Sequence, residues 1–168
     1  MRDAIIEKLN QGITTLGQAV EMLRTENEQS PTETPDHPSP SPWVPVAEGL
    51  IGKHEVQDNA ELTQFLGINP SQAWCAAFAN ACYRECGIEG TGSMRAKDFE
   101  NWGQKCDEID GALGVFEGET GGHVGFVRGD KLLGGNQGDS VKYSNLAWFK
   151  SNMKLLGYRW PSDYPIPT

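Results

Sequence analysis

Three residues with the chemistry of a nucleophilic catalytic site occur in the order Cys75, His123 and Asn136. Cys75 lies near the start of the strongest predicted helix, where the helix dipole and unpaired N–H groups favour the thiolate. Imidazole titrates near neutral pH, so His123 can take up the thiol proton or stabilise the thiolate. A neutral amide such as Asn136 can hold the imidazole in one tautomer. Together they predict a cysteine nucleophile, a histidine base and an orienting amide.

The flanking sequence predicts the elements that must position these residues. Helices are expected at 46–52, 60–66, 73–86 and 96–102, and short strands at 113–116, 123–127, 131–133, 140–143 and 155–160. Helices followed by antiparallel strands predict an α+β fold with helices packed on a small sheet. Each candidate alone also fits an ordinary role: a packed helix cysteine, a strand histidine and a polar turn.

The chain divides into three segments. Residues 1–29 carry apolar residues at alternating spacings of three and four, which predicts an amphipathic, coiled-coil-like anchoring helix. That helix would join copies of the chain or dock on another protein; the alternative is a helix lying on its own domain. Residues 30–45 hold six of the ten prolines and predict an extended linker. Residues 46–168 are the predicted globular domain.

The composition excludes several classes of partner. A net charge of −9 and a pI near 4.8 argue against nucleic acid or an anionic membrane surface. No apolar stretch is long enough for a membrane helix, and the N-terminus does not resemble a secretory signal. Cys82 and Cys86 leave a disulfide or metal role open, but no paired zinc spacing and no Asp-rich loop occur. We therefore expect no metal and no cofactor.

Four ordered motifs carry a family resemblance: Trp74-Cys75-Ala76-Ala77-Phe78, Gly122-His123-Val124-Gly125-Phe126-Val127, Gly134-Gly135-Asn136-Gln137 and Gly157-Tyr158-Arg159-Trp160-Pro161. The chain resembles the CHAP and NlpC-like cell-wall peptidases over residues 46–161. The resemblance implies a papain-like fold and hydrolysis of an amide bond in bacterial peptidoglycan. It would make Cys75 the nucleophile, His123 the base and Asn136 the orienting residue. Many relatives carry Glu where this chain has Gly134, so Asn136 would orient the histidine alone or with another group.

Further roles follow from the same interpretation. The backbone N–H of Cys75 would form an oxyanion hole with Asn69 or Gln72 as second donor. Substrate contacts are assigned to Trp74, which would form a wall beside the sulfur, and to Gln137. Glu55 would either hold a loop or bind a substrate amine. We also expect Cys75 to have a lowered pKa and to react with iodoacetamide faster than the other cysteines.

Three modes of deployment remain open. The chain would be a phage endolysin or a virion-associated lysin, released by lysis with a holin or carried on a virion. The second is a catalytically idle wall-binding or structural virion module. The third is a contact-delivered antibacterial amidase. In the virion-bound case, residues 1–29 would anchor the enzyme and the linker would tether it.

Overall fold

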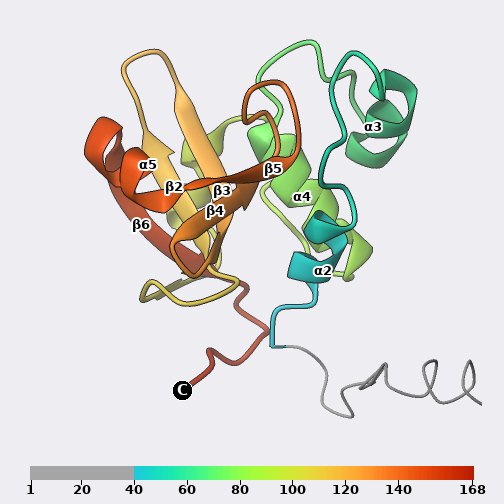
Figure 1. Cartoon of the computed structure of the whole chain (residues 1–168). Coiled ribbons are helices and arrows are strands. Elements are labelled where there is room, and N and C mark those ends of the chain that lie inside the picture. The colour runs from blue at the N-terminus through green and yellow to red at the C-terminus, as the bar shows by residue number, and fades with distance from the viewer. Residues whose placement is uncertain (1–39) are drawn as a thin grey trace, which may run out of the picture. The chain divides into compact units, whose positions relative to one another are not determined.

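The computed structural model describes residues 40–168, with helices first and strands after them (Figure 1). The elements in chain order are α2 (Trp43–Glu48), α3 (Asn59–Leu66), α4 (Cys75–Glu85), the 3₁₀ helix η1 (Ala96–Asn101), β1 (Gln104–Cys106), β2 (Leu113–Glu117), β3 (Gly122–Arg128), β4 (Lys131–Gly134), β5 (Lys142–Asn145), α5 (Leu146–Asn152) and β6 (Lys154–Trp160). The predicted anchoring helix, 1–29, and most of the predicted linker lie outside the described residues.

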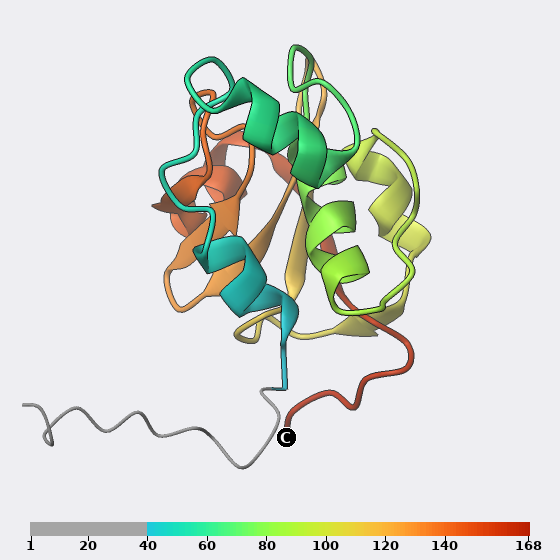
Figure 2. The same cartoon turned by 90° about the vertical axis from the view of Figure 1, so that its right-hand side faces the viewer.

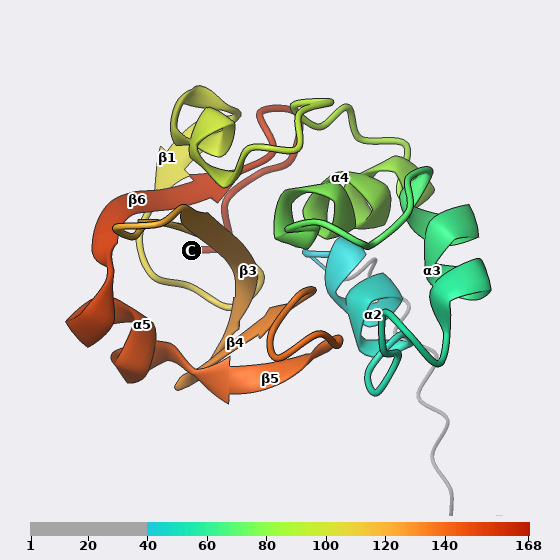
Figure 3. The same cartoon turned by 90° about the horizontal axis from the view of Figure 1, so that it is seen from above.

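The six strands form one antiparallel sheet in the order β1-β6-β2-β3-β4-β5. Helices α2, α3 and α4 lie on one side of the strands (Figure 2), and α5 follows β5 at the far end of the sheet (Figure 3). The predicted α+β class, with helices packed on an antiparallel sheet, is therefore confirmed. No helix within residues 40–168 combines the length and apolarity needed to span a bilayer.

The described domain begins its helical structure at Trp43, before the predicted boundary at residue 46. Trp43 is fully buried, and its ring contacts Trp160 at a centroid distance of 4.9 Å and Tyr83 at 5.4 Å. Pro45 lies in the first turn of α2, where a helix needs no backbone N–H donor. The prediction that residues 43–45 belong to the linker is therefore wrong, because a proline there is compatible with the start of a helix.

Two elements were not predicted from the sequence, β1 and α5. Helix α5 has seven residues and begins after Asn145, whose side-chain oxygen accepts a hydrogen bond from the Trp148 N–H at 3.0 Å. So short a helix depends on tertiary packing, which the buried Leu146 and Phe149 provide. Strand β5 begins at Lys142 rather than Ser140, whereas β6 closely matches the predicted last strand.

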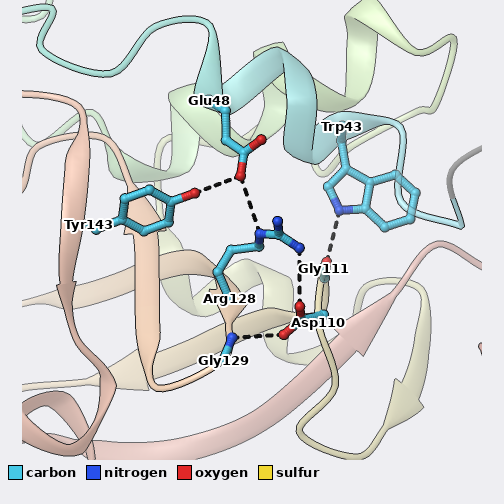
Figure 4. Close-up of polar contacts among 7 residues, drawn as sticks. All are labelled: Trp43, Glu48, Asp110, Gly111, Arg128, Gly129 and Tyr143. Carbon is cyan, nitrogen blue, oxygen red and sulfur yellow. Dashed lines mark hydrogen bonds and ion pairs between the residues drawn. The ribbon is translucent and has the colours of Figure 1, made fainter. Parts of the chain in front are cut away.

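A polar network fastens α2 to the sheet (Figure 4). The Glu48 carboxylate accepts a hydrogen bond from the Tyr143 hydroxyl at 2.6 Å and pairs with Arg128 Nε at 3.3 Å. The same guanidinium pairs with Asp110 at 3.1 Å. These contacts join α2 to β3 and β5.

Candidate active site

Cys75 is the first residue of α4, directly after Trp74. Its sulfur lies against β3, 3.9 Å from the Gly122 carbonyl oxygen, and the Val124 backbone also interacts with it. Gly122 and Val124 flank His123 along the strand. The fold therefore brings the cysteine at the helix start to the segment of strand that carries the histidine, although 47 residues separate Cys75 from Gly122.

The electrostatic environment of Cys75 differs from the prediction. The side chain is only 3% exposed. Burial raises the pKa of the thiol, and the backbone N–H groups of Val124, Ala76 and Cys75 itself oppose that shift without cancelling it. The predicted lowering of the Cys75 pKa is therefore wrong, because desolvation outweighs the start of the helix. Desolvation of the sulfur therefore favours the neutral thiol over the thiolate.

His123 is buried as a neutral imidazole. Its ring stacks on Phe149 of α5, with centroids 4.8 Å apart and planes 10° apart. Burial lowers the pKa of His123 from 6.5 to about 4, while a hydrogen-bonding interaction with Gln137 opposes the shift. An unprotonated imidazole at pH 7 is the form that can accept a proton, so His123 has the protonation state of a general base.

Gln137 is the amide that faces the imidazole. Its Nε2 donates to the carbonyl oxygens of Leu132 and Gly134, each at 3.2 Å, and of Lys142. With the nitrogen fixed on these carbonyls, the acceptor Oε1 is left over, and it is buried with no partner. His123 Nε2 is likewise buried and unpartnered. The two atoms form no hydrogen bond of normal length, yet the side chains interact closely enough for Gln137 to raise the imidazole pKa. A proton on Nε2 would leave Nδ1 as the basic nitrogen.

The position of Asn136 differs from the prediction. Asn136 has a left-handed backbone, with φ of 57°, and its side chain makes no hydrogen bond within residues 40–168. The prediction that Asn136 orients His123 is wrong, because Gln137 is the amide that interacts with the imidazole. Gln137 is 5% exposed and lines the cavity beside His123, so its assignment to substrate contact stays a prediction. The motif identified the turn, but which of two successive amides points inward depends on the backbone conformation of that turn.

Glu55 links Trp74, which precedes Cys75, to the turn that follows Gln137. Its carboxylate accepts a hydrogen bond from the Trp74 indole N–H at 2.9 Å, and its backbone N–H donates to the Asp139 carbonyl at 2.9 Å. A Cβ at Gly135 would lie 2.4 Å from the Trp74 ring, so the indole packs directly against the turn that carries Gln137. Of the two roles considered for Glu55, the structure shows the one that holds a loop. Trp74 is fully buried, so its assignment to substrate contact is wrong.

The two candidate oxyanion donors do not join this arrangement. Asn69 is exposed and directs its amide to the Asn59 side chain at 3.5 Å. Gln72 is exposed and makes no hydrogen bond within residues 40–168. Neither interacts with Cys75 or His123 in that part of the chain. The donors near the sulfur are backbone N–H groups, those of Cys75 and Ala76 in the first turn of α4 and that of Val124 in β3.

A cavity of about 660 Å³ opens beside His123. It is lined by His123, Asn136, Gln137, Gly138, Lys142, Tyr143, Ser144, Asn145, Trp148, Phe149 and Met153. This volume is in the range of small-molecule and peptide sites. Cys75 is not among the lining residues, so the cavity reaches the site from the histidine side.

Residues 40–168 contain neither a cluster of potential metal ligands nor a disulfide. No group of three or more potential metal ligands occurs in this part of the chain. All four cysteines are free, so no disulfide joins Cys82 to Cys86.

In comparisons with known proteins, no family model matches the chain and no curated protein matches it either.

Proposed function

We propose that this chain is a papain-like cysteine hydrolase that cleaves an amide bond of bacterial peptidoglycan. One observation carries the proposal: the sulfur at the start of α4 lies against the strand on both sides of His123, with Gln137 behind the imidazole. A thiol beside the strand that carries an imidazole, with an amide interacting with that imidazole, supports a cysteine hydrolase. The choice of peptidoglycan rests on the resemblance of the four sequence motifs to cell-wall peptidases.

The proposed reaction starts from a neutral thiol and a neutral imidazole. As Cys75 Sγ attacks the peptide carbonyl carbon, its proton passes to His123 Nδ1. Backbone N–H groups at the start of α4 hold the oxyanion. The imidazolium then protonates the leaving amine, which leaves an acyl-enzyme thioester. His123 next removes a proton from water, the resulting hydroxide attacks the thioester, and the free carboxylic acid and the thiol are released.

The proposal also covers how the enzyme reaches the cell wall. We assign the chain to a phage endolysin or a virion-associated lysin, acting on the cell wall and anchored in the second case through residues 1–29. A contact-delivered antibacterial amidase would use the same chemistry. These three deployments differ in how the enzyme reaches the wall and not in the site.

One observation favours a second candidate, a catalytically idle wall-binding or structural virion module. The Cys75 thiol is 3% exposed and its pKa is raised, so a substrate carbonyl reaches the sulfur only if the side chains over it move. A module used for attachment would need no such movement. Activity measured on the intact chain separates the two candidates.

The test is digestion of purified peptidoglycan with mass analysis of the fragments. We expect the wild-type chain to release fragments with new amino and carboxyl ends, and Cys75→Ala to lower the rate by at least about 1000-fold. Cys86→Ala is the matched control, because Cys86 is the C-cap of α4, at the opposite end of the helix from Cys75, and it should digest at the wild-type rate. Binding without fragments would support the idle module. Equal digestion by Cys75→Ala would overturn the proposal.

A further inference from the structure

The cavity beside His123 presents polar groups that have no partners. The side chains of Asn136, Lys142 and Ser144 line it, and none of them makes a hydrogen bond or an ion pair within residues 40–168. We call these three residues the donor wall. An ammonium, an amide and a hydroxyl can all donate hydrogen bonds. No Asp or Glu lines the cavity, so the donor wall faces a space without any fixed negative charge.

Within residues 40–168, the lysines at 105, 131 and 142 form no ion pair with a carboxylate in that range. The net charge is −9, and within residues 40–168 the lysines at 53, 97, 150 and 154 each pair with a carboxylate. Lys142 has no such partner in that range. Its Nζ lies over the turn after Asn136, since a Cβ added to Gly138 would be 2.7 Å from it. The exposed ammonium therefore lies at the rim of the cavity, next to Gly138, where it is available to an anion.

The lining also contains an apolar and aromatic group beside polar residues such as Gln137 and Asn145. Trp148 is 56% exposed, and Phe149 and Met153 line the cavity with it. Large exposed aromatic side chains of this kind are common at binding surfaces. The cavity therefore offers hydrogen-bond donors and a cation together with an apolar wall, a combination that suits a short peptide carrying a carboxylate.

We propose that this cavity binds the stem peptide of the substrate through a free carboxylate, which accepts hydrogen bonds from Lys142 and Asn136. The inference rests on the proposed function, because His123 opens into the same cavity. It adds a specificity to that function: stem peptides with free carboxylates are preferred over those whose carboxylates are amidated. A charge-assisted hydrogen bond to an otherwise unpaired ammonium supplies the preference.

The experiment measures binding without turnover, by calorimetric titration of the full-length Cys75→Ala chain. The probes are the synthetic stem tetrapeptide L-Ala-γ-D-Glu-L-Lys-D-Ala with free carboxylates and the same peptide with its carboxylates as primary amides. We expect the free acid to bind at least about tenfold more tightly. Adding Lys142→Met should remove that preference. Lys105→Met is the matched control, because Lys105 is exposed, unpaired within residues 40–168 and outside the cavity lining.

Three results would overturn the inference: equal affinity for the two probes, no binding of either probe, or a preference that survives Lys142→Met. Loss of the preference in Lys105→Met would assign it to net charge and would overturn the inference as well. The two proposals fail separately. Wall digestion that persists in Cys75→Ala rejects the hydrolase, whereas digestion that requires Cys75 together with equal probe affinities rejects only the carboxylate site.

Discussion

His123 lies between two regions that differ in how their polar groups are used. Around Cys75, the side chains are buried and engaged: Trp74 donates to Glu55, and Gln137 places its amide nitrogen on backbone carbonyls. In the cavity, the amide of Asn136 and the ammonium of Lys142 are unpartnered within residues 40–168. The polar side chains of the first region are thus largely bonded to the protein itself, whereas those of the second have no partner within residues 40–168.

Gln137 and Asn136 are adjacent in the sequence but differ in their contacts, so substitutions at the two positions test the difference between the regions. We expect Gln137→Leu to lower kcat for wall digestion by at least about 100-fold, since it removes the amide behind the base and leaves buried carbonyls without a donor. Asn136→Gly, which suits the left-handed backbone at that position, should raise KM only a few-fold and leave kcat unchanged. Steady-state kinetics on soluble peptidoglycan fragments measure both. A larger kcat loss in Asn136→Gly would reverse the assigned roles.

The buried state of His123 predicts a pH dependence of stability. The imidazole titrates near 6.5 in the unfolded chain and near 4 in the native one, so below pH 6.5 the unfolded state binds more protons. Native stability is therefore complete above pH 6.5 and decreases as the pH falls toward 4. Between pH 7 and 4.5, wild type should lose about 2 to 3 kcal/mol more unfolding free energy than His123→Leu. Urea unfolding at the two pH values checks this, and equal losses in the two chains would contradict a buried neutral imidazole.

The smallest effect concerns thiol reactivity. Because Cys75 is buried and its pKa is raised, iodoacetamide at pH 7 should modify it at least about tenfold more slowly than Cys86, which is partly exposed. The sequence alone predicted the opposite, that Cys75 reacts with iodoacetamide faster than the other cysteines. Mass analysis of the labelled peptides over time gives both rates. If Cys75 were labelled first, its surroundings would be open and electropositive in solution, and the contrast between the two regions would disappear.

Local sequence patterns predicted the helix that carries Cys75 and the strand that carries His123. Small residues ending at Gly87 predicted the helix that begins at Cys75, and apolar alternation after two glycines predicted the strand of His123. Both signals are local, so the sequence could show them. The contact between Glu55 and Trp74 joins residues 19 apart, and only the role of holding a loop, left open for Glu55, anticipated it.

What the sequence determined by itself was the set of chemical groups and the elements that carry them, because side-chain type and periodicity are properties of short segments. The tertiary structure decided three further things: that Gln137 rather than Asn136 faces the imidazole, that burial disfavours both the thiolate and the imidazolium, and that a cavity opens beside α5. The physical reason is the same for all three. Burial, and the direction of a side chain in a turn, are set by what the rest of the chain packs against, and no short segment contains that information.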